Sequence, residues 1–237
     1  IYGLFIKVST NESGNYGLFT EIASNGSVSN LYIQGMINIL GSDSNWVYSG
    51  LLCGKNHGTI SHCYTIQNYT SLSYVEYNES TSTYICYNFD IYCQRENSAI
   101  GGLVGKNDGS IMNCCNCSAI YSKGDIGGIV GESNGGYVGT CDNYNDISYL
   151  YFNNNRSVGG IVGYANSNAT IELCWNFGFM KIENTWTDSR SIQPNVGEII
   201  GHAESVNAFY NNYCEGNVGV NATISDCPWN KDSKLMV

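Results

Sequence analysis

The amino-acid sequence predicts an all-β fold, a parallel β-solenoid of about six or seven coils in a single domain over residues 1–237. Three observations predict it. An apolar pattern flanked by glycines recurs along the chain. The composition favours strands and turns, with 28 Gly and 19 Tyr but only 2 Pro. No window carries the 3.6-residue apolar periodicity of an amphipathic helix.

Six copies of the repeat align on an Ile or Val that follows a glycine-rich turn, and they cover about residues 15–215. The aligned column is Val28, Ile60, Ile111, Val138, Ile171 and Val206. A second apolar block such as Leu103-Val104-Gly105 precedes each member of the column. Each copy therefore predicts a short strand, a tight turn, a second short strand and another turn. Strand-like repeats of this length are typical of solenoids, because one coil cannot bury its apolar face alone.

Glycines mark the corners of the predicted coils. Where the chain must reverse, we expect a positive φ angle, at Gly58, Gly109 and Gly136. A second set ends the first strand of each copy, where a Cβ atom would crowd the corner: Gly105, Gly131, Gly163 and Gly201. A phosphate-binding loop is excluded as the reason for these glycines, since no helix pattern and no GK[ST] follows them.

The longest interruption of the repeat is an insert over about residues 67–97, which is rich in Ser, Thr and Tyr. We expect it to leave one edge of the solenoid as a lateral elaboration. After the last copy, a C-terminal segment of about residues 210–237 contains two cysteines and is expected to be tied down by a disulfide bond.

Charge excludes some classes of partner. The chain has a net charge of −10 with only 10 Lys and Arg, and no basic patch. Nucleic acid is therefore not an expected partner, because phosphate contacts need clustered basic side chains. Direct insertion into a membrane is not expected either, since no apolar run reaches the roughly 18–20 residues of a span. The first residue is Ile1, so either a targeting segment has been removed or the sequence is a fragment.

The repeats resemble those of a known family. The pattern G-[LI]-V-G-x-N-x-G-x-I-x-N-C, best seen from Gly102 to Cys114 and again from Leu52 to Cys63, is similar to the GLUG repeat. The resemblance implies a parallel β-solenoid of secreted or cell-surface proteins, and it implies no catalytic residues. The last copy departs from the pattern, because Glu198 stands where other copies have Gly. That coil is expected to be a distorted cap.

Cysteines recur at one position of the repeat, three residues after the aligned Ile or Val. The column reads Leu31, Cys63, Cys114, Cys141, Cys174 and Phe209. In one interpretation the cysteines are core thiols that act as small hydrophobic side chains. In the other they form disulfides between coils, because stacked strands lie about 4.8 Å apart. A zinc site needs four converging ligands, which a linear stack does not supply.

Other cysteines lie in loops, where a disulfide bond would stabilise most. We predict the pairs Cys86–Cys93, within the insert, and Cys214–Cys227, after the last coil. The chain has 11 cysteines, an odd number, so at least one thiol stays free or pairs with another chain.

Eight Asn-x-Ser/Thr sequons point to a secreted glycoprotein in an extracellular or cell-surface location, with N-glycans as covalent partners. They are Asn11, Asn25, Asn68, Asn78, Asn116, Asn155, Asn168 and Asn221. The number is only a mild excess over chance, so a chain that is merely rich in Asn and Ser remains the alternative.

No catalytic constellation or cofactor site is suggested by the spacing of reactive residues, so an enzyme is not expected. His57, His62 and His202 are the only histidines, and the acidic residues are scattered. The nearest acidic cluster is Asp142 and Asp146, which could form a calcium loop or an ordinary polar turn.

Aromatic residues follow directly after the cysteine column. In a strand, this next position faces outward, so we expect an exposed ladder of Tyr32, Tyr64, Trp175 and Tyr210. Such a ladder could stack on sugar rings or on another protein. Inserts that fold over it are the alternative.

Two functions follow from these features. The first is a non-enzymatic structural protein that assembles with itself, end to end or side by side, into an extracellular filament or coat, because the ends of a solenoid offer unpaired strand edges. The second is a surface adhesin or glycan-binding module. A carbohydrate-active β-helix enzyme is a third possibility.

Overall fold

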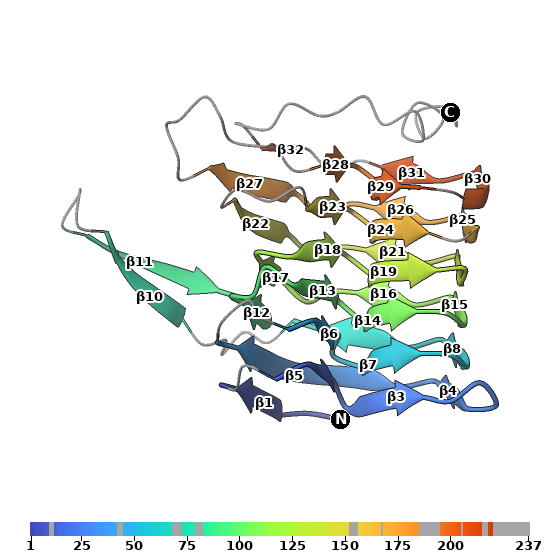
Figure 1. The fold of residues 1–237 in the computed structure, drawn as a ribbon, viewed down its shortest axis with the longest axis horizontal. Helices are drawn as coiled ribbons and strands as arrows, with labels where there is room; N and C mark the ends of the chain where they lie inside the picture. Colours follow the sequence, from blue (N-terminus) through green and yellow to red (C-terminus); the bar gives the residue numbers. More distant parts are fainter. Residues whose placement is uncertain are drawn as a thin grey trace.

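The computed structural model of the chain describes residues 1–9, 12–41, 45–67, 73–78, 83–151, 156–166, 168–184, 195–204, 206–214 and 218–219. It confirms the predicted class: the described residues form a parallel β-solenoid, whose coils stack from the N-terminal to the C-terminal end (Figure 1). The described residues contain no helix that is long and apolar enough to cross a membrane.

Every coil contributes one short strand to each of five columns, which we name A to E in chain order. Column A contains β1 (Leu4–Val8), the second half of β5 (Tyr32–Ile39), β12 (Ile91–Cys93), β17 (Ile120–Ser122), β22 (Ile147–Tyr151), β27 (Met180–Asn184) and β32 (Val218–Gly219). Column B contains β2 (Gly14–Tyr16), β6 (Val47–Ser49), β13 (Ser98–Gly101), β18 (Asp125–Gly127), β23 (Ser157–Gly159) and β28 (Asn195–Gly197).

Columns C to E complete each coil. Column C contains β3 (Phe19–Ile22), β7 (Cys53–Asn56), β14 (Val104–Asn107), β19 (Val130–Asn134), β24 (Val162–Asn166) and β29 (Ile200–Ala203). Column D contains β4 (Ser27–Ser29), β8 (Thr59–Ser61), β15 (Ser110–Met112), β20 (Tyr137–Gly139), β25 (Ala169–Glu172) and β30 (Val206–Tyr210). Column E contains the first half of β5, β9 (Tyr64–Ile66), β16 (Cys115–Asn116), β21 (Asp142–Asn143), β26 (Trp175–Asn176) and β31 (Tyr213–Cys214). The described residues thus hold six coils, and β32 begins a further turn.

The insert leaves the solenoid as an antiparallel hairpin of β10 (Ser73–Asn78) and β11 (Thr83–Asn88). It is inserted in the chain between β9 and β12 and projects sideways from the stack beside β12 (Figure 1). The insert is shorter than the predicted range of 67–97, because β12 already belongs to column A of the third coil and pairs with β5 and β17.

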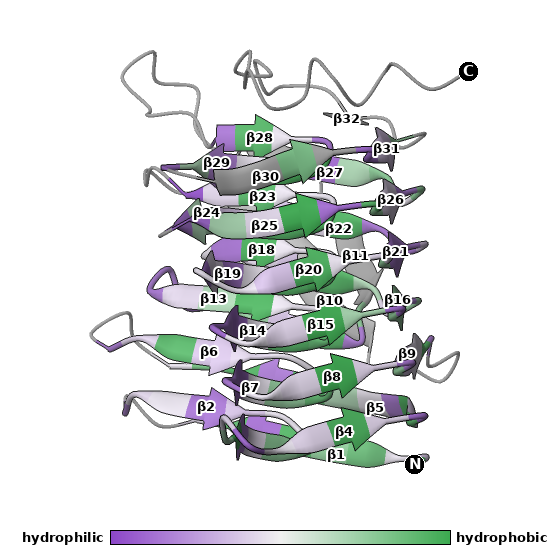
Figure 2. Ribbon diagram, turned by 90° about the vertical axis from the view of Figure 1, so that its right-hand side faces the viewer, coloured by the Kyte–Doolittle hydropathy of each residue, from purple (hydrophilic) through white to green (hydrophobic). Residues whose placement is uncertain are grey.

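The core is a stack of inward-facing aliphatic side chains. In column D, Val28, Ile60, Ile111, Val138 and Ile171 lie in register, and all but the first are fully buried. They form the hydrophobic stripe at the centre of column D in Figure 2. Identical positions in successive coils therefore bury the same face, which is why the repeat is visible in the sequence.

The last coil corrects the predicted alignment. Val206 pairs with Ala169 and Phe209 pairs with Ile171, so the predicted alignment of the last copy is wrong by three residues; a register shift between Ala169 and Thr170 accounts for one of them. A β-bulge adds one residue to a strand and displaces everything after it. The cysteine column consequently ends at Asn212 and not at Phe209, since the Cys174 backbone N–H donates to Asn212 Oδ1 at 2.9 Å.

The corner glycines that end the first strand of each copy have the predicted role of avoiding crowding, whereas those at the chain reversals have a role that differs from the prediction. A Cβ atom at Gly131 would lie 2.4 Å from the Ile100 nitrogen of the preceding coil, which confirms the crowding expected for this set. The prediction of positive φ at Gly58, Gly109 and Gly136 is wrong. These turns stack directly on one another: a Cβ atom at Gly109 would lie 2.3 Å from the Gly58 carbonyl oxygen. Close approach, and not a left-handed backbone, excludes a side chain there.

The left-handed conformation recurs instead at the corner between columns D and E. One residue per coil adopts it, with φ between 52° and 56°: Asn30, His62, Asn113, Thr140, Leu173 and Asn211. Asn tolerates this region, whereas Thr and Leu adopt it at a cost. Because all six coils turn there in the same way, the stack imposes the corner even where the local residue disfavours it.

The cysteine column follows this corner, and its members are buried thiols. Each Sγ donates to the carbonyl two residues earlier, for example Cys114 to Met112 at 3.1 Å and Cys141 to Gly139 at 3.2 Å. Cys63 and Cys174 make the equivalent bonds to Ser61 and Glu172. A cysteine fits because it is small and apolar yet still donates weakly to the carbonyl at the corner.

A ladder of buried asparagines joins the coils at the corner between columns E and A. Asn116 Nδ2 donates to Asn143 Oδ1, and Asn143 Nδ2 donates to Asn176 Oδ1, both at 2.8 Å. Thr65 Oγ1 donates to Asn116 Oδ1 at 2.6 Å at the N-terminal end of this ladder. Each amide also bonds the backbone two residues later, so the side-chain amides of the ladder all have hydrogen-bond partners.

Replacing the central member of the ladder tests its contribution to stability. In Asn143→Ala, the side-chain Oδ1 of Asn176 and the backbone carbonyl oxygen of Asn145 each lose their hydrogen bond from Asn143 Nδ2. We expect the free energy of unfolding in urea to fall by about 2–3 kcal/mol. The matched control is Asn25→Ala in an exposed turn, with an expected change within about 0.5 kcal/mol. Equal effects of the two substitutions would contradict a structural role for the ladder.

Candidate functional site

The predicted aromatic ladder lies on column E and is exposed, but its membership differs from the prediction. At the N-terminal end, Tyr32 and Tyr64 stack with ring centroids 4.9 Å apart. The same register position holds Cys115 and Asp142 in the middle coils, so the ladder is interrupted. Trp175 resumes it.

Tyr210 does not belong to the ladder. After the bulge, β30 places it beside Glu172, and Tyr213 takes the position next to Trp175, with ring centroids 5.7 Å apart. A second aromatic pair flanks the C-terminal part: Tyr144 stacks on Phe177 at 4.8 Å. We call this surface the aromatic edge: Tyr32, Tyr64, Tyr144, Trp175, Phe177 and Tyr213.

The candidate calcium stretch does not gather its oxygen atoms around one point. Asn143 faces inward as part of the asparagine ladder, and Asn145 Nδ2 donates to the Cys117 carbonyl at 2.7 Å. Asp146 Oδ1 accepts from the backbone N–H of Phe179 at 3.1 Å, so it serves the next coil. Among the described residues, no group of three or more His, Cys, Asp or Glu side chains could hold a metal ion.

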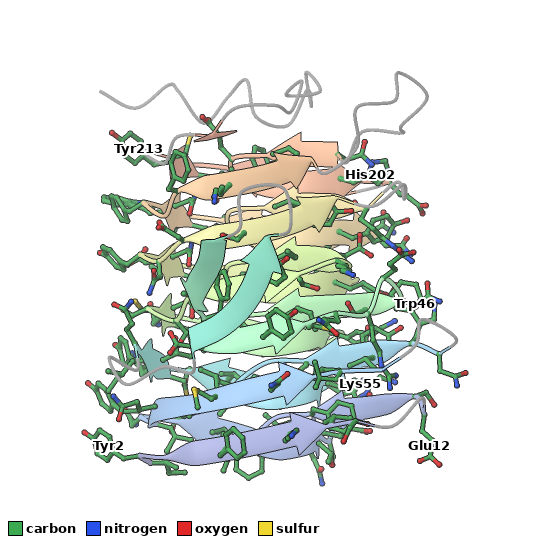
Figure 3. All side chains as sticks on the ribbon, turned by 90° about the vertical axis from the view of Figure 1, so that its left-hand side faces the viewer. Tyr2, Glu12, Trp46, Lys55, His202 and Tyr213 are labelled. Atoms are coloured by element: carbon green, nitrogen blue, oxygen red, sulfur yellow. The ribbon has the colours of Figure 1, made fainter. Side chains whose placement is uncertain are left out.

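A second surface lies between the outer faces of columns B and C, on the opposite edge of the solenoid. Figure 3 shows Trp46, Lys55 and His202 along one edge and Tyr2 and Tyr213 along the other. A cavity of about 400 Å³ opens here along coils four to six, with Trp46 of the second coil also in its lining. We call it the B–C cleft; its lining is Trp46, Asp125, Glu132, Arg156, Ser157, Tyr164, Asn195, His202 and Glu204.

Charged side chains of column C run along this edge in register. The outward position reads Glu21, Lys55, Lys106, Glu132, Tyr164 and His202 from the first coil to the sixth. Lys106 Nζ donates to Glu132 Oε1 at 2.8 Å across neighbouring coils. The ammonium groups of Lys55 and Lys106 also lie 4.9 Å and 5.4 Å from the Tyr48 ring centroid. At the N-terminal end of column C, the side chains of Lys55 and Lys106 therefore occupy the outer surface and pack against Tyr48.

Asp125 lies at the floor of the cleft. Its Oδ1 accepts from the backbone N–H of Ser157 at 2.8 Å, and its Oδ2 lies 3.6 Å from Arg156. Burial raises the pKa of Asp125 to about 6, although Arg156 and the Ser157 N–H act in the opposite direction. The carboxyl group thus changes charge in mildly acidic solution.

Aromatic side chains form the walls of the cleft. The Arg156 guanidinium lies 5.0 Å from the Trp46 ring, and Tyr164 stacks on His202 at 5.3 Å. Burial, and then hydrogen bonding to Glu204, raise the pKa of Tyr164, so it stays a neutral phenol. A cleft with carboxylates, one guanidinium and aromatic walls can bind a polar ligand that offers hydroxyl groups and an apolar face.

Sequence reasoning missed this cleft although a signal was present. In column C, the residue directly after the V-G or I-G of the first block faces outward, and this position aligns Lys106, Glu132, Tyr164 and His202. The residue types differ at every copy, so no motif is visible. The acidic residues looked scattered because the sequence alone does not show that columns B and C face one another.

The predicted disulfide bonds have different outcomes. Cys93 is a free thiol whose side chain is fully buried in the core beneath column A. The predicted pair with Cys86 is therefore wrong, because β11 belongs to the hairpin outside the core; the Cys86 side chain lies outside the described residues. Cys214 Sγ contacts Glu198 Oε2 at 2.6 Å. Cys227 lies outside the described residues, and the pair Cys214–Cys227 stays a prediction.

The predicted N-glycosylation sites lie in different environments. Asn25 and Asn168 are exposed in turns, where a glycan could extend into solvent. Asn116 is fully buried in the asparagine ladder, so we withdraw it as a glycosylation site: a glycan on its amide would break the ladder. Asn11, Asn68, Asn155, Asn221 and the side chain of Asn78 lie outside the described residues.

The environment of Asp125 predicts a pH dependence of stability. Its pKa is higher in the folded chain than in the unfolded chain, so the folded state binds this proton more tightly. The resulting stabilisation is complete below about pH 4 and is lost as the pH rises through 6. We expect the free energy of unfolding of the wild type, minus that of Asp125→Asn, to fall by on the order of 2 kcal/mol from pH 4 to pH 7. Urea unfolding at several pH values measures it, and a constant difference would contradict the assignment.

Comparison with known proteins places the sequence motif within this geometry. The family model described as the GLUG motif matches residues 96–114. These residues contain β13, β14 and β15, which are the column B, C and D strands of the third coil, and end at Cys114 of the cysteine column. No curated protein and no solved structure matches the chain. The expected resemblance to the GLUG-repeat family is thus confirmed, and the chain carries the GLUG motif as three strands of one coil.

Proposed function

We propose that this chain is a non-enzymatic, extracellular structural protein that assembles end to end into a filament or coat. The GLUG motif and the solenoid fold support a protein of this general kind. The observation that carries self-assembly is the N-terminal end of the stack, where the edge strands and the core are both open.

The first coil has strand edges without a neighbour in the described part of the chain. Strands β1, β2, β3 and β4 each pair with the second coil only. Inward-facing Leu4, Ile6 and Leu18 pack against the core but are only partly buried. Phe5 is 55% exposed and Phe19 39% exposed at the same end. Unpaired edges beside exposed apolar side chains favour pairing with another β-structure.

A second copy of the solenoid is the partner that fits this end. The edges of four strands lie at the fixed angles and spacings of one coil, so a partner must present the same cross-section to pair with all of them. A coil of this chain has that cross-section. Parallel pairing would continue the stack head to tail, and a head-to-tail contact that does not close produces a filament.

Substituting the exposed aromatic residues of the first coil tests this assembly. We expect filaments of the wild-type protein in electron micrographs, with an axial repeat of about 29 Å for six coils at roughly 4.8 Å each. Phe5→Lys combined with Phe19→Lys should leave dispersed particles, because lysines on an edge strand oppose pairing.

The control is Tyr144→Lys, which introduces a charge at an equally exposed aromatic residue on the aromatic edge. It should assemble like the wild type. Dispersed wild-type particles or closed dimers at all protein concentrations would refute head-to-tail assembly.

A second candidate function is glycan binding at a cell surface. It is favoured by the aromatic edge, on which Tyr144 is 53% exposed and Trp175 46% exposed. Aromatic faces stack on the apolar faces of sugar rings, and their spacing along a solenoid follows the direction of an extended polysaccharide. The two candidate functions use different surfaces, so one does not exclude the other.

Two tryptophans on opposite edges allow a matched test of glycan binding. We expect neutral polysaccharides such as hydroxyethyl cellulose or galactomannan to retard the wild-type protein in affinity electrophoresis. Trp175→Ala should weaken the retardation about fivefold, the equivalent of about 1 kcal/mol for one stacking contact. Trp46→Ala in the B–C cleft should leave it unchanged. Loss of binding in Trp46→Ala alone would move the site to the cleft.

A further inference from the structure

Two cysteines differ from the buried thiols of the core. Cys115 and Cys117 lie on the outer side of column E, and their sulfur atoms are 3.6 Å apart. Cys115 is 9% exposed, whereas Cys117 is only partly buried. The neighbouring Cys114 points inward and donates to a backbone carbonyl. The pair is thus a dithiol with one sulfur atom open to solvent and one behind it.

The two thiols are chemically unequal. The hydrogen bond from Cys115 lowers the pKa of Cys117 to about 7, and the same bond together with burial raises the pKa of Cys115. Only the thiolate is nucleophilic, so the exposed sulfur is the one that reacts first at neutral pH. In contrast, the hydrogen bond with Cys141 and burial raise the pKa of Cys114 to about 12, which keeps it unreactive.

Hydrogen bonds to neighbouring coils hold the backbone of residues 115–117 in place. Asn116, between the two cysteines, belongs to the asparagine ladder. The Cys117 N–H donates to Thr65 Oγ1 at 3.0 Å, and the Cys117 carbonyl accepts from Asn145 Nδ2 at 2.7 Å. The Cys115 N–H donates to the Cys63 carbonyl at 3.0 Å. The separation of the sulfur atoms is therefore set by the stack and not by a mobile loop.

This spacing disfavours a permanent disulfide bond and favours an exchangeable one. Residues i and i+2 of an extended strand lie about 6.6 Å apart, close to the upper limit of about 6.8 Å between the Cα atoms of a disulfide. A bond closed at that limit is strained and readily reduced. Strained, exposed disulfides are the labile or catalytic ones, whereas structural disulfides are relaxed and resistant to reduction.

We propose that Cys115 and Cys117 form a thiol–disulfide exchange site that reacts with small, solvent-borne disulfides. The Cys117 thiolate attacks one sulfur atom of R–S–S–R, a mixed disulfide forms, and R–S⁻ leaves and takes a proton from solvent. Cys115 then loses its proton to solvent and attacks Cys117 Sγ. The Cys115–Cys117 disulfide forms and the second R–S⁻ leaves. Two cysteine thiols are oxidised, and one disulfide is reduced to two thiols.

The inference is independent of self-assembly and of glycan binding. It uses neither the N-terminal end of the stack nor an aromatic ring as a ligand. Its chemistry requires an external disulfide, which an oxidising compartment supplies.

The test uses the reduced full-length chain and oxidised glutathione. Peptide mapping by mass spectrometry should find a Cys115–Cys117 disulfide in the wild type, with two glutathione molecules released for each disulfide and no glutathione retained at this site. Cys115→Ser should retain one glutathione on Cys117, because the resolving thiol is missing. Cys117→Ser should lose the reaction at this site.

The matched control is Cys114→Ser, which removes the third cysteine of the same segment and should react like the wild type. The reaction rate of the wild type should rise through pH 7 and not through the pH of about 8.5 expected for an ordinary cysteine. Stable glutathione on wild-type Cys117, an oxidised segment in Cys117→Ser, or loss of oxidation in Cys114→Ser would each overturn the proposal. Circular dichroism spectra that match the wild type identify the variants that retain the fold.

Discussion

The in-register pairing of each coil with the next is the constraint on which the rest of this structure depends. Columns B, C and D run through six coils with parallel pairing, and the same position of each repeat recurs in the same environment. A residue type that satisfies one coil is therefore suited to the next. The aliphatic column, the corner thiols, the left-handed corner residues and the asparagine ladder all follow from this register.

Much of the fold could be predicted because six copies in phase give strong evidence for a solenoid, although the pattern in any single copy is weak. The corner glycines and the Ile and Val columns were visible as patterns. Features that depend on the direction of one side chain were not: Asn116 reads as a sequon and lies in the interior. The last copy was aligned three residues too early, on Val206 instead of Phe209; the bulge accounts for one of these residues, and the spacing between the two blocks of a copy varies from coil to coil. The B–C cleft escaped because its residues change type from coil to coil.

Burial separates two kinds of cysteine that are neighbours in the chain. Cys114 and Cys115 are adjacent, yet one faces the core and the other the outside of column E. The inner thiols satisfy carbonyl groups at the corner and are protected from oxidants by the coils around them. Buried core thiols of this kind can therefore stay reduced even in an oxidising environment. In the outer pair, Cys117 is only partly buried, and the reactivity proposed for the pair depends on geometry that the asparagine ladder maintains.

The bulge between Ala169 and Thr170 has a mechanical consequence. A stack of coils that each contact only their neighbours behaves as a one-dimensional rod, and tension along its axis is carried by every coil boundary in series. Such a rod opens at its weakest boundary. The bulge disrupts the pairing of the fifth coil with the sixth, whereas the equivalent pairings of the earlier coils are regular. Under load, the column D contact between the fifth and sixth coils would therefore carry tension unevenly, with the strain concentrated at the interrupted pairing beside Ala169.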